Sequence, residues 1–213
     1  MKNLNITFLP DLDSVEIEKA GRILIENSET HEISTINWPE VFSYKPETKF
    51  NIAHTDHAIW IHFRVTEKNV KAVHLTDQQN VWKDSCVEFF VQSPQDTRYI
   101  NFEFNCIGTC LSTRRKSRDE DVIPLSPDEM QAIERYSSLG RQKLTLAGNT
   151  SWELTVKIPF KILGLSDVAG TTLLGNFYKC GDETETPHYV SWSEIHTEQP
   201  DFHQPEYFGI LHF

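Results

Sequence analysis

The stretch WKDSCVEFFV (residues 82–91), followed closely by YINFEFNC (residues 99–106), decides the fold class. Side chains alternate between the two faces of a β-strand. Apolar residues occupy every second position in both stretches: Val87, Phe89 and Val91, then Ile100, Phe102, Phe104 and Cys106. The pattern predicts an antiparallel hairpin whose apolar side lies in a core.

The other side of this hairpin carries Glu88, Asn101, Glu103 and Asn105, with Trp82 at its edge. An aromatic ring beside carboxylates and amides suits a sugar, because the ring stacks on C–H groups while polar groups bind hydroxyls. Any antiparallel sheet also shows a polar face to water, so the pattern alone supports both interpretations equally. This face carries two amides and no lysine, which favours a binding surface over an ordinary solvent-facing one.

Further alternating stretches predict more strands, at residues 59–65, 70–75, 151–158, 173–179, 188–193 and 207–213. In the first of these we expect Trp60, His62 and Arg64 to face outward, whereas the pattern around Trp152 places that side chain in the core. The fold class predicted is all-β: an antiparallel, jelly-roll-like β-sandwich with a few short helices. Residues 1–213 contain no linker and no repeat, which favours one domain.

Three short helical segments are expected. The first covers residues 13–21, with Asp13 or Ser14 as N-cap and Gly21 just past its end. The second runs from Pro127 to about Arg135, after a capping box. The third is one turn over residues 159–164.

Charge limits the partners. The formal net charge is −11, from 20 Lys and Arg against 31 Asp and Glu, which argues against nucleic acid as a partner. The basic run at residues 114–118 is followed at once by acidic residues 119–121, which is typical of a solvated loop; a local role in binding a polar or anionic ligand is the alternative. We find no signal peptide and no membrane-spanning stretch, so we expect the chain as written to be cytoplasmic, without excluding secretion.

Motifs for catalysis are scarce. The sequence has no phosphate-binding glycine loop, no His-Glu-x-x-His and no Gly-x-Ser-x-Gly. Glu88 and Glu103 could form the acid/base pair of a glycoside hydrolase, but an open sheet face is a poor place to raise the pKa of a carboxyl group.

Metal-binding and redox signals are weak as well. The four cysteines, Cys86, Cys106, Cys110 and Cys180, are expected to be buried free thiols. Residues 54–57 (His-Thr-Asp-His) are interpreted as a solvated turn, and residues 182–185 as an acidic loop that could supply a calcium ligand or two.

Residues 82–90 resemble the family 9 carbohydrate-binding modules attached to xylanases. The chain is still more similar to stand-alone family 9-like proteins of gut and environmental bacteria, over nearly its whole length. The segments that carry this likeness are residues 99–109, 176–182, 189–193 and 200–209.

The resemblance implies a β-sandwich that clamps the end of a saccharide between two Trp rings. It assigns Trp82 and Trp192 as the stacking pair, Glu88 as the first hydroxyl-binding carboxylate and Asn176 as a late-strand amide. The family's sugar-facing Arg has no match at residues 101–105. Many such modules hold structural calcium, although no metal ligand can be assigned residue by residue.

The leading hypothesis is therefore a non-catalytic protein that binds an oligo- or polysaccharide such as xylan, in bacterial carbohydrate catabolism. No cofactor is required, structural calcium is allowed, and the sequence says nothing of the oligomeric state. The expected binding residues are Trp82, Glu88, Asn101, Glu103, Asn105, Asn176 and Trp192. A xylanase-like hydrolase using Glu88 and Glu103 is the alternative. A third possibility is an interaction domain within a larger assembly, or a heme-binding sandwich whose axial ligand would have to be a histidine.

Overall fold

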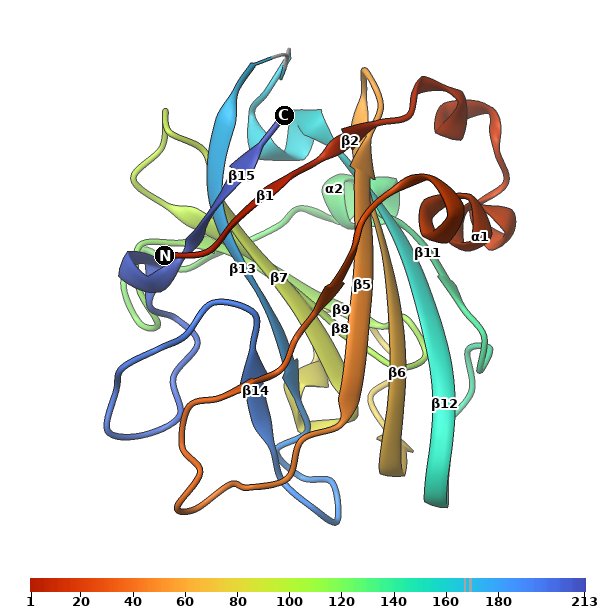
Figure 1. Cartoon of the computed structure of the whole chain (residues 1–213), viewed down its shortest axis with the longest axis vertical. Coiled ribbons are helices and arrows are strands. Elements are labelled where there is room, and N and C mark those ends of the chain that lie inside the picture. Colours follow the sequence, from red (N-terminus) through yellow and green to blue (C-terminus); the bar gives the residue numbers. More distant parts are fainter. Residues whose placement is uncertain (167, 169) are drawn as a thin grey trace.

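The computed structural model describes residues 1–166, 168 and 170–213, and shows two β-sheets packed face to face (Figure 1). The first sheet, here the site sheet, has nine strands. Its main path is β1 (Asn3–Asn5), β15 (Gly209–His212), β13 (Thr172–Cys180), β7 (Cys86–Gln92), β8 (Tyr99–Asn105), β9 (Cys110–Arg115) and β10 (Ile123–Pro124). Strand β14 (Tyr189–Ser191) joins β13 and also pairs with β4 (Thr35–Ile36).

The second sheet has six strands. Its path is β11 (Glu134–Ser137), β12 (Leu144–Pro159), β6 (Ala58–Ala72), β5 (Glu47–His54) and β2 (Thr7–Phe8), and β3 (Thr30–Glu32) pairs with β5. In both sheets neighbouring strands are antiparallel, except for β1 with β15 and β2 with β5. The predicted antiparallel sandwich is confirmed.

The main core lies between the two sheets. Phe50 of β5 stacks on Phe177 of β13, with ring centroids 4.0 Å apart. The apolar faces of the β7–β8 hairpin are buried here, as predicted, and Phe89 and Phe102 are fully enclosed. Burying each large aromatic side chain removes 150–250 Å² from water, so this layer supplies much of the stability.

The outer face of the second sheet differs from the expectation. Trp60 and His62 are buried there, because α1 (Ile17–Asn27) lies across that face (Figure 1). Leu24 of the helix packs in one cluster with Trp60. The prediction that Trp60 and His62 face solvent is wrong; Arg64, next along the strand, is partly exposed.

The predicted end of this helix is also wrong. Gly21 lies in the middle of α1, where a Cβ atom would come 2.6 Å from the His62 ring. The glycine that reads as a helix stop therefore permits close packing of helix on sheet. Residues 10–14, which include the expected N-cap, form the separate 3₁₀ turn η1 (Pro10–Ser14).

The other short helices follow the sequence more closely. Helix α2 (Pro127–Ala132) has the expected capping box between Ser126 and Glu129. It ends before Arg135, which belongs to β11. The turn η3 (Phe160–Leu163) ends at Gly164, whose φ of 69° is left-handed as a C-cap requires.

Two smaller expectations concern strands. Trp152 is 1% exposed, so its predicted place in the core is confirmed, and its indole Nε1 donates to Glu67 Oε1 at 2.8 Å. Strand β6 ends at Ala72, short of the predicted residue 75. Within the described part of the chain, no helix is both long and apolar enough to cross a membrane.

Candidate functional site

The polar face of the β7–β8 hairpin is covered rather than open. A second cluster of aromatic side chains packs on this outer face of the site sheet, with Phe90, Tyr99 and Tyr178 from the strands. Residues of the 192–208 segment close over them, and Phe202 stacks on Tyr178 at 4.3 Å between ring centroids. The prediction that this face of the hairpin is open to solvent is therefore wrong.

A cavity of about 620 Å³ remains between this covering segment and the sheet. Its volume lies within the range of about 300–1,000 Å³ that ligand pockets occupy. The charged and aromatic side chains that line it are Glu88, Glu103, Asp119, Asp182, Asp201, Arg115, Arg118, His203, Phe42, Trp82, Tyr189 and Phe202. Both signs of charge and several aromatic side chains thus line one partly open cavity.

Three of the seven predicted binding residues line the cavity: Trp82, Glu88 and Glu103. Trp82 belongs to the 3₁₀ turn η2 (Val81–Lys83), which precedes β7, and its ring is partly exposed. Glu88 and Glu103 face each other across β7 and β8. Both carboxylates are nearly sealed from bulk water, at 3% and 4% exposed.

The three asparagine side chains predicted to bind ligand instead make hydrogen bonds within the protein. Asn101 Nδ2 donates to Glu103 Oε1 at 2.8 Å and so orients that carboxylate. Asn105 Nδ2 donates to Asp84 Oδ2 at 3.0 Å, and its Oδ1 accepts from the Thr109 N–H. None of the three amide residues lines the described cavity.

Asn176 bonds the backbone of the segment that follows β14. Its Nδ2 donates to the Ser193 carbonyl at 3.0 Å, and its Oδ1 accepts from the Ser193 N–H at 2.8 Å. This pair of bonds holds the beginning of the covering segment against β13. Asn176 thereby shapes the cavity's cover, and the expectation that it contacts ligand is not met.

The predicted position of Trp192 in the binding site is also wrong. It is 3% exposed and belongs to the core between the sheets, where its ring meets Phe177 edge to face at 5.7 Å. Its ring also packs closely over Gly209. The two-tryptophan clamp is therefore wrong, and the other rings at the cavity are those of Phe42, Tyr189 and Phe202.

Two arginines of the basic run, Arg115 and Arg118, also line the cavity. The sequence favoured a solvated loop for this run, and contact with a polar ligand was the alternative. Arg115 is the last residue of β9, the neighbour of β8, and is 9% exposed. Its Nε donates to Thr113 Oγ1 at 2.7 Å and its Nη1 donates to the Arg118 carbonyl at 2.9 Å. Leu111, Thr113 and Arg115 alternate along one strand, and that periodicity was the signal available in the sequence.

Burial sets the protonation of the cavity's acidic groups. It raises the pKa of Glu88 well above its usual range, helped by the charge of Glu103, and it also raises the pKa of Glu103. Burial raises the pKa of Asp182 to about 6. Desolvation disfavours the charged form of each carboxyl group, and a carboxyl group in its neutral form can donate a hydrogen bond to a ligand oxygen as well as accept one.

Glu103 has an unused acceptor. Its Oε2 is buried and has no hydrogen-bond partner among the described residues. A buried polar atom without a partner costs free energy, and Glu103 keeps one although the residue lines the cavity. His203 adds a neutral group, because burial and the charge of Arg115 lower its pKa to about 3. Its Nδ1 is 2.8 Å from the Tyr99 hydroxyl.

All four cysteines are free and buried, as predicted. Within the described residues, one group of three or more metal-capable side chains converges: Cys86, Glu88 and Cys180. The acidic run at residues 182–185 is not part of it, and calcium binding stays a prediction.

The chain matches the model of carbohydrate-binding family 9 over residues 19–213. A solved structure of a candidate carbohydrate-binding protein from Bacteroides uniformis is 39% identical, with a TM-score of 0.94, covering 100% of this chain and 99% of the other. No curated protein matches the sequence.

Two solved structures of a family 9 carbohydrate-binding module from Caldicellulosiruptor kristjanssonii share the fold at 12% identity. The complex with glucose has a TM-score of 0.60 and covers 99% of this chain and 95% of the module. The complex with cellotriose has a TM-score of 0.62 and covers 99% and 93%. The family model spans most of the chain, and the fold agrees with it; this protein belongs to carbohydrate-binding family 9.

Proposed function

We propose that the protein binds the end of a glucose-based oligosaccharide in the 620 Å³ cavity and does not cleave it. Family membership supports carbohydrate binding. The complexes of the Caldicellulosiruptor module with glucose and cellotriose supply the ligand class to be tried first. Xylan fragments, expected from the sequence, are the second class.

The contacts available in the cavity suit a sugar ring. The Trp82 ring offers a flat apolar face for the C–H groups of a pyranose. Glu88 and Glu103 accept hydrogen bonds from hydroxyl groups, whereas Arg115 donates to hydroxyl oxygens. The 192–208 segment covers one side of the cavity, which favours a chain end over an internal unit, since an internal unit must leave the cavity on both sides.

The observation that carries the proposal is the cavity itself, where the Trp82 ring, the Glu103 carboxyl group and the Arg115 guanidinium line one space. A sugar ring can stack on the first of these and hydrogen-bond to the other two. Site polar groups left unpaired without the right ligand are a strong source of selectivity.

Isothermal titration calorimetry with glucose, cellotriose and xylotriose tests the proposal. Glu103→Gln should weaken binding of the best ligand at least tenfold, about 1.4 kcal/mol. Glu47→Gln, at an exposed position of β5 in the other sheet, is the matched control and should bind as the wild type does. Absence of binding to every saccharide of the panel would contradict the proposal.

Hydrolysis is the second candidate, and one observation favours it. Glu88 and Glu103 lie on adjacent strands, and the pKa of each is raised by burial, as the acid of a glycosidase requires. Chromatography of cellotriose and xylotriose after long incubation separates the two functions. Intact oligosaccharide supports binding alone, and shortened products that disappear in Glu88→Gln would establish an enzyme.

A further inference from the structure

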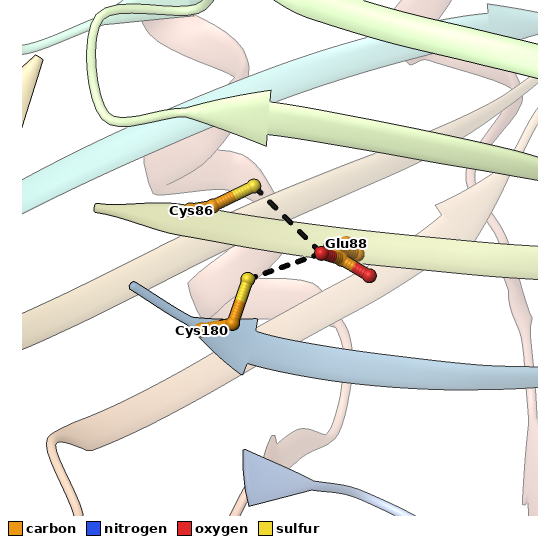
Figure 2. A group of neighbouring side chains, drawn as sticks. All are labelled: Cys86, Glu88 and Cys180. Atoms are coloured by element: carbon orange, nitrogen blue, oxygen red, sulfur yellow. Dashed lines mark hydrogen bonds between the residues drawn. The ribbon is translucent and has the colours of Figure 1, made fainter. Parts of the chain in front are cut away.

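Cys86, Glu88 and Cys180 bring two sulfur atoms and one carboxylate oxygen together in the site sheet (Figure 2). Cys86 and Cys180 are directly opposed on β7 and β13, and Glu88 lies two residues after Cys86 on the same face. We propose that these three side chains bind a thiophilic divalent cation of the zinc class. This site shares Glu88 with the proposed sugar contacts, whereas its two thiols have no part in them.

The spacing of the three atoms fits tetrahedral coordination. Cys180 Sγ lies 3.1 Å and Cys86 Sγ 4.0 Å from the same Glu88 oxygen, and the three ligand atoms are all within 4.8 Å of one another. Zinc–sulfur bonds of about 2.3 Å and zinc–oxygen bonds of about 2.0–2.2 Å at tetrahedral angles place neighbouring ligand atoms roughly 3.5–3.8 Å apart. A cation therefore fits with shifts of a few tenths of an ångström to about 1 Å.

The ligand set selects the kind of ion. Two thiolates are soft ligands, which favour zinc and its relatives over calcium or magnesium. Three protein ligands leave a fourth position open, which is the arrangement of zinc sites that also bind water or another ligand. Cys180 and Glu88 both line the cavity, so the open position would be reached from there.

Charge at this point of the sheet also favours a cation. Glu88 is crowded by the negative charge of Glu103, and a dication would relieve that repulsion. The nearby cation Lys179 is already paired with Glu67, at 2.9 Å and fully buried. Burial raises the pKa of both thiols and of Glu88, so without metal these groups hold protons. Binding must release the two thiol protons and the Glu88 proton as the metal–sulfur and metal–oxygen bonds form.

In the absence of metal the two thiols donate weak hydrogen bonds to Glu88, which are the contacts drawn in Figure 2. Such bonds alone would also keep the cysteines in place. The two roles differ in one respect that can be measured: only a metal site forms cobalt–thiolate bonds with an intense absorption in the near ultraviolet.

The test is a titration of the reduced, metal-free protein with Co²⁺, followed by displacement with Zn²⁺, in the absence of any saccharide. We expect one equivalent of Co²⁺ to develop a thiolate-to-cobalt charge-transfer band, and Zn²⁺ to remove it. Calorimetry of Zn²⁺ binding in two buffers of different ionisation enthalpy should report release of about two to three protons, two from the thiols and the remainder from Glu88. Because no sugar is present, the outcome is independent of the proposed function.

Three variants locate the site. Cys86→Ala and Cys180→Ala should each lose the band, while Cys110→Ala, a buried free cysteine outside the cluster, should keep it. If either cluster variant fails to fold, Glu88→Gln serves instead and should weaken Co²⁺ binding at least tenfold with the band retained. A wild-type protein that gives no charge-transfer band, or a band that survives in both cluster variants, would overturn the proposal.

Discussion

Glu88 and Glu103 lie directly opposite each other on β7 and β8, and both carboxyl groups line one cavity. Like charges at opposed positions of a sheet destabilise it, and burial adds to that cost. The protein keeps them nonetheless, with Asn101 bonded to one and the thiol of Cys180 bonded to the other. Groups held at a cost to stability are typical of binding sites.

Arg115→Lys should weaken saccharide binding about fivefold to twentyfold. The guanidinium of Arg115 bonds to Thr113 Oγ1 and to the Arg118 carbonyl at the same time, which orients it in the cavity wall. A lysine ammonium cannot reproduce that planar fork. Calorimetry with the best ligand measures the effect. Arg98→Lys, remote from this cavity, is the control, and equal affinities in the two variants would refute a role for Arg115.

Lys179→Met should destabilise the protein by about 3–5 kcal/mol, because it leaves the Glu67 carboxylate buried and unpaired. The double variant Lys179→Met/Glu67→Gln removes the buried charge and should recover much of the loss. Urea denaturation of the wild type, both single variants and the double variant completes the cycle. Additive effects of the two substitutions would show that the pair is not coupled.

Gly21→Ala should lower the free energy of unfolding, although alanine is intrinsically better than glycine in a helix by about 1 kcal/mol. The added Cβ would lie 2.6 Å from the buried His62 ring, so α1 must shift away from the sheet. Arg22→Ala, at the next and largely exposed position, should change stability little. A Gly21→Ala protein more stable than the wild type would contradict the close packing.

His62 should make the protein less stable as the pH falls. Burial, aided by the charge of Arg64, lowers its pKa to about 4, despite the Glu153 carboxylate 3.8 Å from Nε2. Between pH 6.5 and about 4 the unfolded chain binds a proton that the folded chain does not, so the free energy of unfolding decreases through this range. The full effect of a shift of this size is about 3 kcal/mol.

The wild type and His62→Asn can be compared by urea denaturation at a series of pH values. The variant should lose this part of the slope, whereas His57→Asn, at an exposed position, should keep it. Identical slopes in the wild type and His62→Asn would show that His62 is not held neutral.

Alternation in the sequence was enough to predict the sandwich, because strands such as β7, β8 and β12 bury one face in the central core. It could not predict what covers their other faces. Gly21 looks like a helix stop unless the His62 ring beneath it is known. Likewise, Trp192 and Trp82 look equivalent in sequence, and only the tertiary packing of Trp192 against Phe177 separates them.

The alternation of apolar and polar residues could not predict the cavity, for a similar reason. Its cover, around Phe202 and His203, is irregular and has no periodicity to read. Arg115 was missed because its basic neighbours suggested a solvated loop, although it continues the alternation of β9. The residues on the hairpin itself, Glu88 and Glu103, were found because regular strands place them.

Calorimetric titration of the wild type, Trp82→Ala and Tyr136→Ala with the best-binding oligosaccharide tests the central claim most directly. Trp82 lines the cavity, whereas Tyr136 is a half-exposed aromatic residue on β11 of the other sheet. Loss of ring stacking should weaken binding about tenfold or more in Trp82→Ala and leave Tyr136→Ala unchanged. Full affinity in a folded Trp82→Ala protein would contradict a saccharide site in this cavity.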